Sequence, residues 1–134
     1  MLNPSSATEA VDDPTIRRVA GFSRRWGFGS AVVVNLFALR STNPAAIALH
    51  PDPVGPENDA SIVGAAATAD QMVVAWGNHG AVSNPATGAV RHTEVAALLP
   101  DVTPLCLGVT ALGQPRHPLY MPWETVPREV PALA

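Results

Sequence analysis

Short apolar runs that alternate with helix-forming segments constrain the fold of this chain more than any other feature. The runs are rich in Val and Leu and lie at residues 31–39, 72–76 and 104–107. Helices are predicted between them, over residues 57–69 and 90–99, with a further one beginning near Asp13. Such alternation is typical of a mostly parallel sheet with helices on both faces and right-handed crossovers.

The first predicted helix has clear end signals. Asp13 is suited to cap it, Pro14 fits its first turn, and Gly27 can end it. Four arginines share its polar face, which we interpret as solvated, with nucleic-acid contact as the alternative: Arg17, Arg18, Arg24 and Arg25. An Ala-rich turn of helix is expected after Pro44, a Pro-rich loop at 50–56, and an irregular tail from Pro122.

The first strand of the predicted sheet is almost absent. Met1 stands immediately before Asn3-Pro4, which leaves little room for a strand. In a sheet of this type the first strand is usually central, and its loss exposes unpaired edges on its neighbours. Either the true start lies upstream of Met1, or this version of the fold lacks a strand and is less stable.

Length and composition favour one domain, with a core at 1–122 and a Pro-rich tail at 123–134. Hydrophobic residues make up 47% of the 134, and all eight basic residues are Arg. The net charge of −3 disfavours tight nonspecific DNA binding. The one cysteine, Cys106, is expected to be buried, and we predict a cytoplasmic protein with no membrane partner, because no apolar run reaches roughly 18 residues.

Polar residues follow the apolar runs where each predicted strand ends. Carboxyl ends of parallel strands meet at one edge, where open α/β sheets bind ligands. We therefore predict a pocket lined by Asn3, Asn35, His79, Arg116 and His117.

The two asparagines admit both a functional and a structural interpretation. The Asn3 amide can orient a water or a ligand, or it can cap the backbone of its own loop. Asn35 interrupts a buried Val-rich run, so its amide needs partners, either a neighbouring backbone or the edge of a nucleobase.

The remaining candidates also carry alternatives. His117 can donate to a developing negative charge or be a structural loop histidine, and Arg116 can bind an anion or be solvated. The loop that holds His79 can bind phosphate, although Trp76 before it can equally be core. Arg40 can reach an anionic ligand or pair with Glu57 or Asp59.

Several reaction classes are disfavoured by missing motifs. The four histidines show no zinc-binding spacing and there is no cysteine pair, so neither a metal nor another cofactor is expected. No phosphate-binding Walker loop, dinucleotide GxGxxG motif or GxSxG serine motif is present.

Several sequence blocks together resemble a bacterial family of uncharacterised proteins, the domain of unknown function 1643 family. The blocks span Met1 to about Pro122 and include MLNPSSA, VVNLFALRSTNP, DPVGPEND, AWGNHG and GQPRHPLY. Members of that family carry an apolar strand before the MLNPS block, so the resemblance implies a truncated start here. It implies no established activity.

More distantly, the chain resembles the uracil-DNA glycosylase superfamily. Leu2-Asn3-Pro4-Ser5 is similar to its first motif, where an Asn holds the attacking water. Val34-Asn35 is similar to the strand end that reads uracil, and His117-Pro118 to the second catalytic motif, with Leu119 in place of its Ser. The resemblance implies a three-layer αβα domain with a mostly parallel four-stranded sheet.

Three functions follow as hypotheses. The first is a hydrolase of an N-glycosidic bond, with Asn3 and His117 as catalytic residues. The second is a non-catalytic nucleobase- or nucleotide-binding module, and the third is a structural protein whose strand edge is completed by another chain. For the first two we expect these residues to contact the ligand: Pro4, Ser5, Asn35, Arg40, Trp76, His79, Arg116 and Tyr120.

Overall fold

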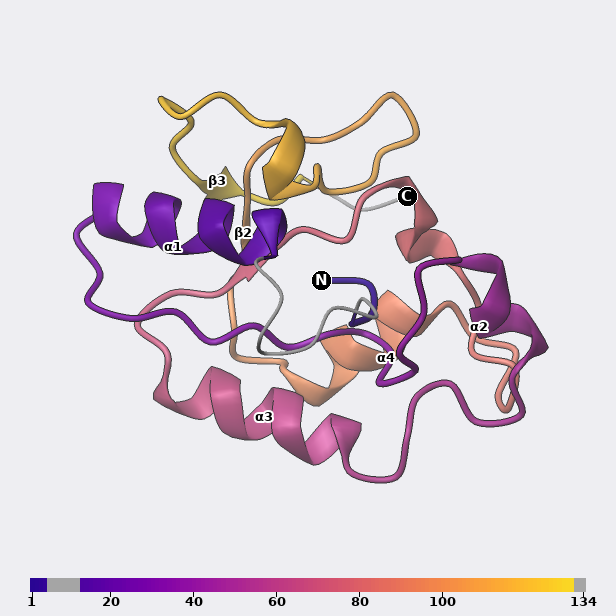
Figure 1. The fold of residues 1–134 in the computed structure, drawn as a ribbon. Helices are drawn as coiled ribbons and strands as arrows, with labels where there is room; N and C mark the ends of the chain where they lie inside the picture. The colour runs from indigo at the N-terminus through magenta and orange to yellow at the C-terminus, as the bar shows by residue number, and fades with distance from the viewer. Residues whose placement is uncertain (5–12, 132–134) are drawn as a thin grey trace.

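The extended segments of the chain form a thin central layer with helices on two sides (Figure 1). The computed structural model describes residues 1–4 and 13–131. Helix α1 (Pro14–Arg25) lies on one side of the layer. Helices α3 (Asn58–Thr68) and α4 (Arg91–Leu98) lie on the other. The mixed α/β class predicted from the sequence is confirmed.

The sheet is smaller than predicted. Its strands are β1 (Val73–Val74), β2 (Leu105–Cys106) and β3 (Arg128–Glu129), in the order β1-β2-β3. The β1 and β2 strands are parallel, whereas β2 and β3 are antiparallel. The predicted four-stranded, mostly parallel arrangement is therefore not confirmed in the described part of the chain.

The prediction of an irregular tail is wrong at β3. Residues 128–129 pair with β2, and the N–H of Val130 donates to the carbonyl of Pro104 at 3.3 Å. The free edge of β2 provides the partner, which short-range sequence signals do not reveal. Pro127 and Pro131 lie on either side of this pair, where a missing N–H limits the ladder to two residues.

The buried strand predicted at residues 31–39 is not confirmed within the described chain: these residues form no regular strand, and Val32 is 76% exposed. Their later half lies beside the chain start: the N–H of Leu36 donates to the carbonyl of Met1 at 3.0 Å, and that of Phe37 to Leu2 at 2.9 Å. The Met1 amino group donates to the carbonyl of Val34 at 3.0 Å. This pattern is that of a short parallel pairing between Met1-Leu2 and the segment around Asn35.

The predicted helices are confirmed. The Asp13 carboxylate caps α1 by accepting from the N–H groups of Thr15 and Ile16, at 2.8 and 3.4 Å. Gly27 follows this helix with φ of 87°, a backbone conformation that favours glycine. The short helix α2 (Ala45–Leu49) follows Pro44, and α3 and α4 fall within the ranges predicted for them.

One arginine of α1 is not on a solvated face, contrary to prediction. The Arg18 guanidinium lies 3.8 Å from the centre of the Trp123 ring and donates to the carbonyl of Met121. The tail of the chain folds back over α1, which helical periodicity alone does not reveal. Arg24 and Arg25 are exposed, as predicted.

The hydrophobic core lies between the extended segments, α3 and α4. It consists of seven buried side chains: Leu36, Phe37, Ile47, Ile62, Trp76, Val95 and Leu99. Cys106 is buried beside them as a free thiol, as predicted. No helix of residues 1–4 and 13–131 is long and apolar enough to cross a membrane.

Arg91 is the largest buried side chain and connects three elements. Only 2% of its side chain is exposed. Its Nε donates to the carbonyl of Leu36 at 2.9 Å, and its two terminal nitrogens pair with Asp59 of α3 and Glu94 of α4. A buried guanidinium needs such partners, so Arg91 is placed to fix the extended segment against both helices.

Candidate functional site

The loops that follow β1 and β2 meet at the carboxyl edge of the small sheet. The N–H of Gly77 donates to the carbonyl of Pro115 at 2.8 Å, which joins the two loops. Gly77 has φ of 74°, and a Cβ placed on it would lie 3.9 Å from the Cβ of His117. The turn into the short 3-10 helix η1 (Asn78–Ala81) therefore lies directly beside His117.

His117 is half-buried and held by its own loop. Its Nδ1 accepts a hydrogen bond from the N–H of Leu119 at 3.3 Å, at the start of the 3-10 helix η2 (Pro118–Tyr120). Because Nδ1 accepts, the neutral ring carries its proton on Nε2. The centre of the Tyr120 ring lies 5.8 Å from that of His117.

Burial and two charged groups act on the pKa of His117. Burial lowers this pKa below its usual value, and the ammonium group of Met1 lowers it further. The carboxylate of Asp13 acts in the opposite direction. The imidazole is therefore neutral at neutral pH, and it lies within electrostatic range of both the chain start and the amino end of α1.

Asn3 holds the loop after the extended segment. Its Nδ2 lies 3.1 Å from the carbonyl of Leu39, 2.9 Å from that of Ser41 and 3.2 Å from that of Pro4. The Ser41 N–H in turn donates to the carbonyl of Pro4 at 3.1 Å. These contacts are those of the structural alternative, and they fix the direction of the side-chain oxygen. Its catalytic role stays a prediction.

Asn35 lies on the wall of a cavity of about 360 Å³. Its backbone carbonyl accepts from Nδ2 of Asn58 at 3.0 Å, so a neighbouring element does hold this strand end. Within the described chain, however, its own side-chain amide makes no hydrogen bond. Met1, Trp76 and Pro118 line the same end of the cavity, next to the carboxyl edge.

Trp76 packs as a core side chain. Its Nε1 donates to the Gln114 side chain at 2.9 Å, and its ring stacks on the buried His92 ring with centres 5.4 Å apart. Gly80 lies against the same indole: a Cβ on Gly80 would lie 1.6 Å from the ring carbon Cδ1. The glycines of the AWGNHG block are thus required by a turn at Gly77 and by close packing at Gly80.

The other predicted contacts lie around the rim of this edge. His79, Arg116, Tyr120 and Arg40 are exposed. The Arg116 guanidinium is directed by a 3.0 Å hydrogen bond from its Nε to the carbonyl of Val109. Asp59, offered as a partner of Arg40, instead pairs with Arg91. Ser5 lies outside the described residues.

The structure thus brings part of the predicted set together. His117, Tyr120 and the 77–79 turn form one group, and Met1 and Asn35 lie at the adjoining end of the cavity. The sequence predicted only a capping role for Asp13, although the Asp13 carboxylate also raises the pKa of His117. Its position where α1 leaves the carboxyl edge is the signal that could have identified it.

Among residues 1–4 and 13–131, no three His, Cys, Asp or Glu side chains are grouped so that they could hold a metal ion. The arrangement can instead supply an amide, a neutral imidazole that donates from Nε2, and a partly apolar cavity. These groups are suited to bind an uncharged planar ligand.

Comparison with known proteins identifies the family of the chain. No curated protein and no solved structure matches it. A family model described as a protein of unknown function, DUF1643, matches residues 1–119. This match covers most of the chain, all of the described elements up to β2 and the site as far as Leu119, so the chain belongs to the DUF1643 family.

Proposed function

We propose that this protein binds a nucleobase or nucleotide at the carboxyl ends of its extended segments, with Asn35 reading the base. The observation that carries the proposal is the Asn35 amide, which lies on a cavity wall and has no hydrogen-bond partner within the described chain. The Asn35 amide is open to the cavity and not sealed from water, so the edge of a ligand can replace the water that solvates it. A side-chain amide pairs with the N–H and C=O edge of a base.

The size and chemistry of the cavity support such a ligand. Its volume of about 360 Å³ lies within the roughly 300–1,000 Å³ of typical small-molecule sites. At the edge end its wall combines the Trp76 indole and Pro118 with the single amide of Asn35. The net charge of −3 favours a small free ligand over a DNA duplex.

A second candidate is hydrolysis of an N-glycosidic bond, and the hydrogen bond to His117 Nδ1 favours it. The neutral ring can donate from Nε2 to a departing base anion, as oxyanion donors do. The fixed Asn3 side chain would direct its oxygen to the attacking water. An amide cannot accept a proton from that water, so we expect slow turnover. The likeness of these motifs to uracil-DNA glycosylases agrees with both candidates.

Thermal-shift measurements with uracil, other nucleobases, nucleosides, nucleotides and a uracil-containing oligonucleotide test the binding proposal. A ligand at 100 times its Kd should stabilise the protein by about 2.7 kcal/mol. Asn35→Ala should abolish the shift. Gln71→Ala is the matched control, because Gln71 is an amide residue that lines the same cavity but stands before β1, away from the carboxyl ends of the strands, and should leave the shift unchanged.

A base-release assay then separates the two candidates. If the protein is a hydrolase, His117→Gln should lose turnover and keep the ligand-induced shift in Tm. For binding alone, no free base should appear with any substrate. The binding proposal would be abandoned if no compound shifted a well-folded protein, or if Asn35→Ala shifted as much as the unaltered protein.

A further inference from the structure

Two arginine side chains converge on the backbone just after β2. Gly108 follows this strand at the carboxyl edge of the sheet, and it is buried with φ of 133°. A Cβ placed on Gly108 would lie 3.5 Å from the terminal nitrogen Nη2 of Arg128 and 3.6 Å from Cδ of Arg116. Because Gly108 has no side chain, both arginines have room over the same piece of backbone. We call Arg116 and Arg128 the arginine pair.

Arg116 is held in position by the backbone that it covers. Its N–H donates to the carbonyl of Gly108 at 2.8 Å, and its Nε donates to the carbonyl of Val109 at 3.0 Å. These two contacts fix both the backbone and the guanidinium of Arg116. Within the described chain its two terminal nitrogens form no hydrogen bond and no ion pair. Arg116 therefore presents oriented donors that are free to bind a ligand.

Arg128 is brought to the same place by the pairing of β3. The register sets Arg128 opposite Cys106, and Figure 1 shows the yellow tail of the chain beside β2. The Arg128 side chain forms no hydrogen bond and no ion pair in residues 1–4 and 13–131. The neighbouring Glu129 projects to the other face of β3, because successive side chains of a strand alternate. Within the described chain, therefore, no carboxylate neutralises the arginine pair.

Two unpaired guanidinium groups over one glycine are suited to a doubly charged anion. A carboxylate is planar and carries one charge, so a single guanidinium can satisfy it. A phosphate group carries up to two charges and three acceptor oxygens, so it can accept from both side chains at once. The net charge of the chain is −3, so the arginine pair is a local positive site on an acidic protein. This chemistry favours a phosphate group as the ligand.

The arginine pair adjoins the candidate site. Arg116 directly precedes His117, and Leu107, which directly precedes Gly108, lines the larger cavity together with Pro118. We propose that the arginine pair binds a phosphate group, so that the ligand of this protein is a nucleotide and not a free nucleobase or nucleoside. The base half of this statement rests on the proposed function, whereas the phosphate half rests on the arginine pair alone.

Calorimetric titration with inorganic pyrophosphate at low ionic strength tests the phosphate half without a base. Arg116→Gln and Arg128→Gln should each weaken pyrophosphate binding at least tenfold, because each removes one of the two guanidinium groups. Both side chains are exposed, so both variants should fold, which circular dichroism checks. No binding of pyrophosphate, or equal binding by the unaltered protein and both variants, would overturn the proposal.

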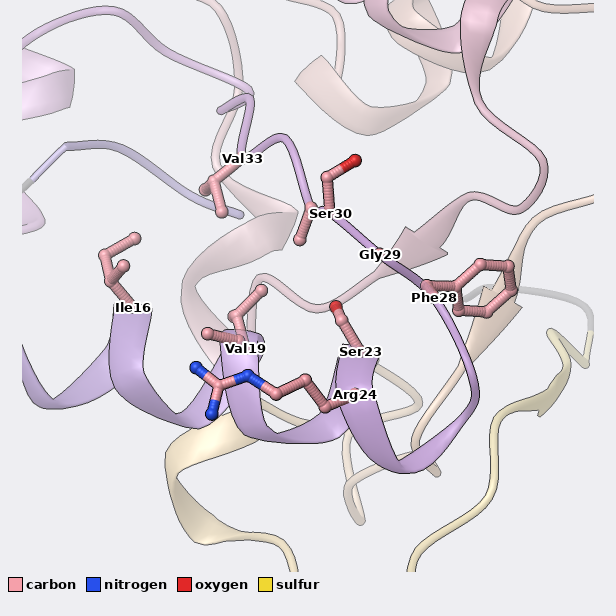
Figure 2. Close-up of a pocket in the computed structure, with 10 residues that line it drawn as sticks. Ile16, Val19, Ser23, Arg24, Phe28, Gly29, Ser30 and Val33 are labelled. Carbon is pink, nitrogen blue, oxygen red and sulfur yellow. The ribbon is translucent and has the colours of Figure 1, made fainter.

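Arg24 supplies the matched control. It lines a separate groove of about 190 Å³ between α1 and residues 28–33, which we call the smaller groove. Figure 2 shows Ile16 and Val19 of α1 at this groove with the Arg24 guanidinium beside them, and no second arginine lines it. Arg24→Gln removes one positive charge, as Arg128→Gln does, and should change pyrophosphate affinity less than twofold. An equal loss in the two variants would show that only net charge matters and would overturn the site.

Nucleoside 5′-monophosphates, each compared with its own nucleoside, test the whole proposal. The nucleotide should bind at least tenfold more tightly, and Arg128→Gln should remove this advantage. Equal affinity for nucleotide and nucleoside would overturn the arginine pair and leave the role of Asn35 intact. Pyrophosphate binding that depends on Arg128, without any shift from a base, would support the phosphate site and overturn the proposed function.

Discussion

The two halves of the extended segment at residues 31–39 have similar composition but different surroundings. In the later half, the N–H groups of Leu36, Phe37, Ala38 and Leu39 all donate to other segments of the chain. Leu36 and Phe37 are almost fully buried. In the earlier half, no N–H donates within the described chain, and Val32 is 76% exposed. We call residues 36–39 the tied half and residues 31–34 the open half.

This difference shows that partners, and not intrinsic preference, order an extended segment. The open half, Ala-Val-Val-Val, is the richer of the two in residues that favour strands, yet only the tied half, Leu-Phe-Ala-Leu, has backbone partners. Preference for the strand conformation is largely a measure of packing against neighbours. The tied half is fixed by Arg91 and by the Met1–Leu2 backbone, whereas the open half lines the larger cavity.

The largest effect is expected when the tied half loses Arg91. Arg91→Met removes the donor to the Leu36 carbonyl and both ion pairs, so the free energy of unfolding should fall by about 3 kcal/mol or more. Urea denaturation measures this change. The matched control is Arg25→Met on the exposed face of α1, which should change stability by less than about 0.5 kcal/mol. A similar small effect of both substitutions would show that Arg91 does not fix the tied half.

The next largest effect concerns the Met1 amino group, which donates to the Val34 carbonyl at the boundary of the two halves. Its pKa is about 8 in the unfolded chain and about 5 in the folded protein, so between these values only the unfolded state binds the proton. Stability should therefore be full above pH 8 and fall as pH decreases toward 5, by at most about 1.4 kcal/mol per unit. Burial also lowers the pKa of His117, which adds a loss of the same sign below its usual pKa.

Acetylation of Met1 separates these two contributions. It removes the amine and should abolish the loss between pH 8 and about 6.5, while the His117 contribution at lower pH remains. Denaturant midpoints measured across this range give the slope. An unchanged slope after acetylation would mean that the Met1 amine is solvated and not buried beside Val34.

The sequence predicted the helices well because their signals are local. The Asp13 cap, the proline after it and the spacing of apolar residues all act within a few positions. Strand pairing depends on segments far apart in the chain, so the sheet order and β3 were not predictable in the same way.

The sequence predicted where the candidate site lies, but it did not predict which residues contact one another there. The carboxyl edge does bring His117 beside the turn after β1, as the alternation of elements indicated. The Asn3 contacts with the 39–41 loop depend on how that loop folds back, and the pairing of Asp59 with Arg91 depends on the meeting of α3 and α4. Neither is encoded in spacing along the chain.

A third prediction concerns the packing of Gly80 on Trp76, a core residue that clusters with Leu36 and Phe37 of the tied half. Gly80→Ala would place a Cβ 1.6 Å from the Trp76 ring, so the indole must shift, at a cost of about 1–3 kcal/mol. The matched control is Gly64→Ala in α3, where nothing lies within 4 Å of the added carbon. That substitution should stabilise the helix by up to about 1 kcal/mol. Thermal unfolding of the two variants should shift in opposite directions; a shared direction would contradict the packing of Trp76 on Gly80.

The smallest effect is expected for Arg18, which joins α1 to the tail of the chain at Met121 and Trp123. Arg18→Met removes the guanidinium above Trp123 and the hydrogen bond to the Met121 carbonyl, so stability should fall by about 1 kcal/mol. Because α1 lines the larger cavity beside residues 31–34, the same change should also increase binding of an apolar dye to the open half. Arg25→Met, on the exposed face of α1 and away from the groove, should change neither quantity. An effect of Arg18→Met on stability without a change in dye binding would mean that the tail stabilises α1 but does not determine how far the open half is covered.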